Sequence, residues 1–210
     1  PDMEEGFPGN LDVRVDYTLT DDNELRIEYT ATTDRPTVVN LSNHSYFNLS
    51  GAKESVLGHY VRIFAKDYVV TDGDLIPTGE IAKVKGTPLD LRRWTRIGDR
   101  MDRLPNGFDN SYCVAGRSGR KPVLVAELYD PVSGRELKTF TTQPGLCFYT
   151  AKTLNTRANT RHGHPYSASW GACFETQHHP DSPNHPNFPT TVLRPGDTYH
   201  EVTVYRVGCR

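Results

Sequence analysis

The sequence predicts an all-β sandwich of mostly antiparallel strands, and three observations lead to this fold class. Short segments of alternating apolar and polar residues recur with turn-forming residues between them, and no segment carries the sustained period of a long helix. Hydrophobic residues make up only 36% of the 210 residues, and the mean hydropathy is −0.61. This composition suits sheets with one face in water better than a parallel sheet buried on both faces.

The first strands are expected to form an antiparallel hairpin. Residues 11–19 alternate strictly and place Leu, Val, Val, Tyr and Leu on one face, which predicts a half-buried strand. After a turn at residues 21–23, residues 24–31 return with their apolar side chains on the inner face. Residues 37–41 predict a third strand, which leads directly into a segment rich in Asn and Ser.

The rest of the chain repeats this pattern of short strands and turns. Residues 90–98 have mixed periodicity, which fits a short helix or a loop, and residues 104–109 predict a turn. Residues 155–169 predict a long exposed loop, and the proline-rich residues 181–189 predict a rigid loop. The further expected strands cover residues 61–70, 112–114, 123–129, 137–142, 146–150, 172–176 and 199–207.

The length and composition predict one domain over residues 1–210. An all-β chain of this length can bury a single core, and no repeat or composition shift divides it. A net charge of −2 without a basic cluster argues against a nucleic-acid partner. No apolar run reaches the roughly eighteen residues of a membrane span, so we expect no membrane partner. The polar, acidic start at residues 1–5 does not fit a signal peptide.

The segment 40–51 has the densest set of polar side chains in the sequence. Apolar Leu41, Phe47 and Leu49 alternate with three Asn and three Ser around His44. Such donors and acceptors can hold an imidazole in one tautomer and orientation, as acid–base chemistry requires. The alternative is an edge strand or turn whose Asn and Ser side chains satisfy the local backbone. Residue types alone leave both interpretations open.

Part of this segment, Asn43-His-Ser-Tyr-Phe-Asn-Leu49, resembles the signature of the aldose 1-epimerases, the galactose mutarotases. Other motifs follow in the family's order over nearly the whole chain. They are Gly6-Phe-Pro-Gly-Asn-Leu11, Pro77-Thr-Gly-Glu80, Gly86-Thr-Pro-Leu-Asp90, Phe108-Asp109, Gly145-Leu-Cys-Phe-Tyr149 and Glu175-Thr-Gln177. The resemblance implies a galactose mutarotase-like β-sandwich, also called a supersandwich.

The resemblance also implies a reaction, the interconversion of the α and β anomers of a hexose such as galactose or glucose. Ring opening needs a base that takes the proton from the C1 hydroxyl and an acid that protonates the ring oxygen. Rotation about the C1–C2 bond and reclosure then invert the anomer. One carboxylate and one protonated imidazole suffice for these steps, so we expect no metal and no other cofactor.

His44 and Glu175 are the residues that the resemblance assigns to these roles, with His44 as general acid and Glu175 as general base. Glu175 lies in an aromatic and apolar stretch with Trp170, Cys173 and Phe174, where loss of solvation should raise its pKa. Taken alone, Glu175 fits equally well as a strand-edge carboxylate that pairs with an arginine.

Three further residues are expected to bind the sugar. The resemblance implies that Asp109 accepts hydrogen bonds from sugar hydroxyls, although a turn residue capping its own backbone is the alternative. Asn43 and Tyr46 flank the candidate acid in the motif, and we expect both to contact substrate. Tyr46, Phe47 and Tyr149 could each stack on a sugar face, and core packing is the alternative for each.

The remaining histidines do not predict a metal site. His162, His164, His178, His179 and His185 show no spacing that matches a known ligand motif. All five lie in polar loops, where exposed histidine is ordinary. The sequence therefore predicts no metal ligands.

The cysteines and glycosylation sequons point to a reducing compartment. Cys113, Cys147, Cys173 and Cys209 form no Cys-x-x-Cys pair, and the first three lie in apolar or aromatic runs typical of buried free thiols. Three Asn-x-Ser sequons fall within residues 40–50, where glycans would obstruct the expected site. We therefore expect a cytoplasmic protein, as a monomer or homodimer.

Three other functions stay open. One is a non-catalytic carbohydrate-binding or regulatory protein on the same fold, although the presence of both His44 and Glu175 favours catalysis. Another is an epimerase of sugar phosphates, for which Arg92, Arg93 and Arg96 are candidate phosphate ligands. For these arginines a solvated face is the better interpretation. The third is a different isomerisation next to a carbonyl or hemiacetal.

One departure from the family concerns the N-terminal portion. The resemblance implies an additional His and Arg upstream of the motifs found here, and residue 1 is Pro. A start at Pro is consistent with a fragment, a cleaved product or a partly observed chain, and if the N-terminal strands are absent we expect a sheet edge or core face to be left uncovered. We also expect the full-length protein to be active and these 210 residues alone to be weak or inactive.

Overall fold

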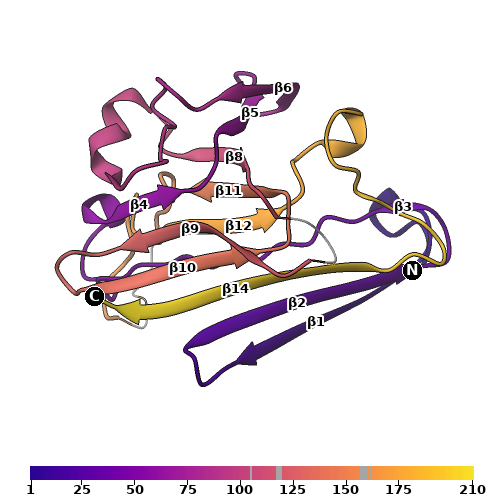
Figure 1. The fold of residues 1–210 in the computed structure, drawn as a ribbon, viewed down its shortest axis with the longest axis horizontal. Helices are drawn as coiled ribbons and strands as arrows, with labels where there is room; N and C mark the ends of the chain where they lie inside the picture. The colour runs from indigo at the N-terminus through magenta and orange to yellow at the C-terminus, as the bar shows by residue number, and fades with distance from the viewer. Residues whose placement is uncertain (105, 117–119, 157–159, 161) are drawn as a thin grey trace.

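The predicted all-β sandwich is confirmed by a computed structural model, which describes residues 1–104, 106–116, 120–156, 160 and 162–210 (Figure 1). Two large sheets of antiparallel strands form the layers, and a two-stranded sheet lies beside them. In these described ranges no helix is long and apolar enough to cross a membrane.

The larger sheet has seven strands, listed here in spatial order. They are β1 (Leu11–Leu19), β2 (Glu24–Thr33), β14 (Tyr199–Cys209), β10 (Arg135–Thr141), β9 (Val123–Tyr129), β4 (Tyr60–Ile63) and β7 (Thr95–Arg96). The β1–β2 hairpin has the predicted antiparallel register, with Leu19 opposite Leu25 at the turn.

The second layer has five strands, again in spatial order. They are β12 (Cys173–Gln177), β11 (Gly145–Tyr149), β8 (Asp109–Cys113), β5 (Asp67–Thr71) and β6 (Pro77–Lys83). The small sheet pairs β13 (Val192–Leu193) with β3 (Thr37–Val38). Four short 3-10 helices are η1 (Glu4–Gly6), η2 (Val56–Gly58), η3 (Ile97–Arg103) and η4 (Ser182–Asn184).

Several predicted elements differ from the structure. The single strand expected at residues 61–70 is wrong, because β4 and β5 belong to different sheets and the chain crosses between the layers at residues 64–66. The strand expected at 37–41 ends at Val38, and the chain beyond it has no regular ladder. The sequence analysis missed β6, β7 and β13.

Two predicted loops lie partly outside the described residues. The turn expected at 104–109 includes residue 105, and the loop expected at 155–169 includes residues 157–159 and 161. The described part of residues 90–98 contains β7 and the start of η3 rather than a loop alone.

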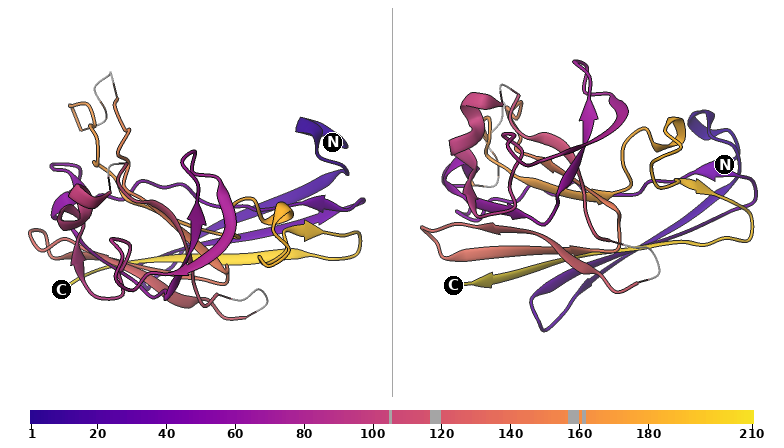
Figure 2. Two further views of the ribbon diagram at one scale, coloured as in Figure 1. Left: turned by 90° about the horizontal axis from the view of Figure 1, so that it is seen from above. Right: turned by 45° about the horizontal axis from the view of Figure 1, so that its top comes forward.

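The β1 strand is correctly placed in the sequence, but the predicted half-burial is wrong. Its alternate apolar side chains are exposed, from 38% for Leu11 and Val15 to 80% for Leu19. In Figures 1 and 2 the β1–β2 hairpin forms the edge of the seven-stranded sheet. Alternation identifies which side chains share a face, but it does not say whether a second layer covers that face.

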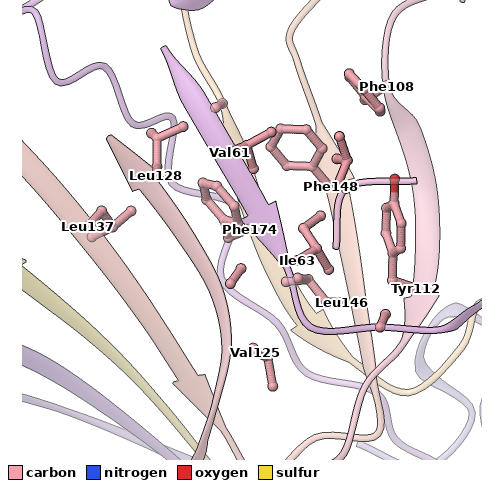
Figure 3. Close-up of a cluster of buried hydrophobic side chains, with 14 of the residues drawn as sticks. Val61, Ile63, Phe108, Tyr112, Val125, Leu128, Leu137, Leu146, Phe148 and Phe174 are labelled. Carbon is pink, nitrogen blue, oxygen red and sulfur yellow. The ribbon is translucent and has the colours of Figure 1, made fainter. Parts of the chain in front are cut away.

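The core lies between the two large sheets and is built by strand alternation. In the five-stranded sheet Tyr112, Phe148 and Phe174 point inward and are at most 1% exposed. Figure 3 shows them facing Val61 and Val125 from the seven-stranded sheet. Because successive side chains of a strand point to opposite faces, the residues next to these aromatics point to the outer face of the five-stranded sheet.

Candidate active site

The motif segment that contains His44 runs along β12, the edge strand of the five-stranded sheet. The amide of Asn40 makes two hydrogen bonds with the backbone of His178, donating to its carbonyl at 3.1 Å and accepting from its N–H at 2.9 Å. The Ser42 hydroxyl donates to the carbonyl of Thr176 at 3.1 Å. Side chains therefore satisfy this edge where a neighbouring strand would otherwise pair.

The other end of the segment is attached in the same way. Phe47 and Ala172 exchange two backbone hydrogen bonds of 2.9 Å, and the Asn48 amide donates to the carbonyl of Trp170 at 2.9 Å. The segment is thus tethered on both sides of His44. The side chains of Asn40, Ser42 and Asn48 thus bind backbone groups and hold the segment rather than the imidazole itself.

The outer face of the five-stranded sheet presents two rows of side chains beside this segment. In the register of β8, β11 and β12, Asp109 lies opposite Tyr149, and Tyr149 lies opposite Cys173. The next row places Ser111, Cys147 and Glu175 side by side. The described strands therefore bring two carboxylates, two thiols and a phenol to one face.

His44 and Glu175 meet at the centre of this arrangement. The Nε2 atom of His44 lies 3.1 Å from Oε1 of Glu175, and the side chains are 51% and 13% exposed, respectively. Burial raises the pKa of Glu175, while the charge of His44 lowers it and that of Asp109 raises it. The predicted rise of the Glu175 pKa is confirmed. The surroundings of Glu175 differ from those predicted, since Phe174 points into the core instead of lining the carboxylate.

Asp109 begins β8 and belongs to the same face. The Sγ atom of Cys147 lies 3.8 Å from Oδ1 of Asp109, and burial raises the pKa of the carboxyl group. The contact with Cys147 and the charge of His44 lower it to a smaller extent. The structure brings Asp109 into the site rather than leaving it as a turn residue.

Tyr46 lies over the site, whereas Asn43 points elsewhere. The Tyr46 ring centroid is 5.0 Å from that of His44 and 6.4 Å from that of Tyr149. The side-chain Oδ1 of Asn43 accepts a hydrogen bond from the Ser45 N–H at 3.1 Å, and its Nδ2 donates to the Tyr17 hydroxyl at 3.5 Å. Contact of Asn43 with substrate stays a prediction.

Gly171 makes room for the Tyr46 ring. A Cβ atom at Gly171 would lie 2.8 Å from Cδ1 of Tyr46 and 3.0 Å from its Cβ, closer than side chains normally approach. The absence of a side chain at Gly171 therefore allows the Tyr46 ring to take its position over the site.

Sequence reasoning treated Cys147 and Cys173 only as buried thiols, but both line the site. Burial raises the pKa of each thiol above its usual range. The signal was present in the two-residue spacing of Cys173 and Glu175, because residues i and i+2 of a strand share a face. All four cysteines are free.

One of the five histidines that were expected to be exposed in polar loops is buried. His179 is only 3% exposed, and its Nδ1 lies 3.1 Å from the Ser111 hydroxyl at the end of the site row. Burial lowers its pKa to about 4, with the charge of His178 as the second cause. His162 and His164, by contrast, lie in an aromatic cluster with Tyr166.

The arginines considered as phosphate ligands lie apart from the site. Arg92 and Arg93 line a separate pocket of about 320 Å³ together with Asp90. Arg92 forms an ion pair with Asp90 at 2.7 Å, and Arg96 lies 3.4 Å from Asp99. None of the predicted site residues lines this pocket.

Comparison with known proteins then decides the family. The sequence matches the family described as aldose 1-epimerase over residues 1–206. The chain belongs to the aldose 1-epimerase family. It is 44% identical over 208 residues to galactose mutarotase of Homo sapiens and 37% identical over 212 residues to aldose 1-epimerase of Escherichia coli strain K12.

Solved structures give the same assignment. The aldose epimerase homologue from C. elegans superposes with a TM-score of 0.88 at 30% identity, with 100% of this chain and 63% of that chain covered. Galactose 1-epimerase from Lactobacillus acidophilus superposes with a TM-score of 0.82 at 26% identity, covering 60% of that chain. The match covers 98% of this chain, which spans 60% and 61% of the length of the human and E. coli relatives, respectively.

Proposed function

We propose that this protein is an aldose 1-epimerase that interconverts the α and β anomers of a hexose such as galactose or glucose. The observation that carries the proposal is the 3.1 Å separation of His44 Nε2 and Glu175 Oε1. The C1 hydroxyl and the ring oxygen are bonded to the same carbon, so a base and an acid that serve them must lie within roughly 8 Å of each other, and this pair meets that requirement.

In the proposed reaction the Glu175 carboxylate takes the proton of the C1 hydroxyl while the His44 imidazolium protonates the ring oxygen. The C1–O5 bond breaks and an open-chain aldehyde forms. Rotation about C1–C2 exposes the other carbonyl face. Closure then returns one proton from Glu175 to the new C1 hydroxyl and one from the C5 hydroxyl to His44, which restores both groups.

The other residues of the outer face have supporting roles in this proposal. The Asp109 carboxylate accepts hydrogen bonds from sugar hydroxyls, and Tyr46 packs against the apolar C–H face of the sugar. Asn43 is retained as a substrate contact by extension from the motif. We place the reaction in the cytoplasm, because four free thiols fit a reducing compartment.

The test follows the optical rotation of fresh α-D-galactose and α-D-glucose with wild type, His44→Ala and Glu175→Gln. The full-length wild-type protein should accelerate relaxation, and each substitution made in it should reduce kcat by roughly 10²- to 10⁴-fold, because each removes one proton-transfer group. His200→Ala on β14 of the seven-stranded sheet and Glu80→Gln, an exposed residue of β6, serve as matched controls.

Two results would refute parts of the proposal. Acceleration that survives either site substitution would remove the acid–base assignment. Sugar binding without any acceleration by the full-length protein would instead favour the non-catalytic carbohydrate-binding protein, whereas the same result with these 210 residues alone would indicate an incomplete site.

A further inference from the structure

The Cys173 thiol has no part in the proposed proton transfers, but it lies beside the two groups that do. The thiol of Cys173, a ring nitrogen of His44 and a carboxylate oxygen of Glu175 all lie within 4.8 Å of one another. A thiol, an imidazole and a carboxylate together form a donor set that suits Zn²⁺ and similar thiophilic cations.

The backbone brings these donors together without a change of fold. Cys173 and Glu175 are two residues apart on β12 and face the same side, while the tethered segment supplies His44. In a tetrahedral zinc site neighbouring ligand atoms lie about 3.3 to 3.7 Å apart, so the cluster needs a contraction of roughly 1 Å. The half-exposed His44 ring can supply that adjustment.

The charge around the cluster also favours a cation. Glu175 and Asp109 lie on the same outer face of the five-stranded sheet, and Glu175 forms its ion pair with His44. Across the described ranges no lysine or arginine pairs with either carboxylate. A divalent cation would therefore meet two carboxylates of one face without displacing a lysine or arginine of the described residues.

We propose that His44, Cys173 and Glu175 form an inhibitory binding site for a thiophilic divalent cation such as Zn²⁺. The bound ion occupies the lone pair of His44 Nε2 and a carboxylate oxygen of Glu175, so neither group can exchange a proton with the sugar. The fourth coordination position faces the solvent-exposed side of His44 and is left for water. The inhibition rests on the proposed function, whereas the binding does not.

The binding test is titration of the reduced protein with Co²⁺, read by its absorption spectrum. Co²⁺ replaces Zn²⁺ in such sites and gives a thiolate charge-transfer band and the intense visible bands of tetrahedral coordination. Wild type should show both at about one ion per chain, and added Zn²⁺ should remove them. Cys173→Ala should lose the thiolate band.

Two cysteine variants serve as controls. Cys209→Ala removes an exposed thiol on β14, and Cys147→Ala removes the other thiol of the same face. Both should keep the thiolate band. No band in wild type, or a band that survives Cys173→Ala and disappears in Cys147→Ala, would overturn the assignment.

The inhibition test measures galactose mutarotation against Zn²⁺ concentration, with Mg²⁺ as the control ion and chelator added at the end. Zn²⁺ should stop wild type reversibly, Mg²⁺ should not, and Cys173→Ala should need roughly tenfold more Zn²⁺ for half-inhibition of its own rate. Co²⁺ binding with an unchanged wild-type rate would overturn inhibition. A protein that binds Co²⁺ but has no mutarotase activity would overturn the proposed function and leave the metal site standing.

Discussion

The two faces of the five-stranded sheet are made by the same strands and differ in almost every property. On β11, Leu146 and Phe148 point into the core with no exposure, while Cys147 and Tyr149 point to the outer face beside the candidate catalytic residues. The inner face is apolar and closely packed, and the outer face carries partly exposed ionisable groups. Strand alternation thus separates the residues that stabilise the fold from those that can do chemistry, one position apart.

The separation of the two faces also explains why ionisable side chains are tolerated on the outer face. A carboxylate on the inner face would have to be neutral or paired, whereas Glu175 and Asp109 lie where burial is sufficient to raise their pKa values without removing all solvent. The core behind them holds the strands in register. This rigid support keeps the outer side chains at defined distances from the tethered segment.

The comparison is tested most strongly by two adjacent residues of β11. Phe148→Ala should lower the free energy of unfolding by about 3 to 5 kcal/mol, because it opens a cavity among buried aromatic rings. Cys147→Ala should cost about 1 kcal/mol. Urea denaturation of both variants measures the difference. Equal losses would mean that the two faces contribute alike to stability.

Substitution of His179, which lies buried beside Ser111, tests whether a residue next to the outer face contributes to stability. Its pKa is lowered to about 4 by burial, against about 6.5 in an unfolded chain. Between these values the unfolded state binds a proton that the folded state does not, so stability falls as the pH falls, by about 3 kcal/mol in total. Above pH 6.5 this contribution to the pH dependence vanishes.

Urea unfolding at pH 7 and pH 4.5 measures this effect. His179→Gln should lose less stability on acidification than wild type, because it has no proton to bind. His162→Gln, at an exposed position, should behave like wild type. If acidification destabilises His179→Gln and wild type equally, His179 does not control acid stability.

Asp109 tests the outer face by activity alone. Asp109→Asn should lower kcat/KM for galactose by roughly 10- to 100-fold, because hydrogen bonds to a charged group contribute about 1.5 to 3 kcal/mol. Its unfolding free energy should change little, since burial already disfavours the charge. Polarimetry and urea denaturation give both quantities, with Asp74→Asn at an exposed turn as control. A large stability loss with unchanged kcat/KM would assign Asp109 to the fold.

Gly171 gives the smallest expected effect. Gly171→Ala places a methyl group against Tyr46, so the ring must shift. We expect KM for galactose to rise by about threefold with kcat nearly unchanged, since a weakened aromatic contact costs roughly 0.5 to 1 kcal/mol. Gly73→Ala, where a Cβ meets nothing within 4 Å, is the control. Identical KM values in both variants would mean that Tyr46 does not contact the sugar.

Local patterns predicted most strands because a two-residue period needs only neighbouring residues. The strands at 123–129 and 11–19 have the predicted bounds. Residues 61–70 failed because a continuous run of strand-forming residues does not reveal that the chain changes sheets in the middle. The candidate site residues His44, Glu175 and Asp109 were predicted through resemblance, whereas Cys173 was not predicted to lie beside them.

The sequence by itself determined the antiparallel all-β class, the side chains that share a face of each strand, and the motifs of the aldose 1-epimerase family. Only the tertiary structure decided that the apolar face of β1 is exposed, that His179 is buried, and that His44 meets Glu175 and Cys173. The physical reason is the sequence distance over which each interaction acts. Alternation and turn chemistry act between neighbours, whereas burial and contact depend on which distant segments pack together.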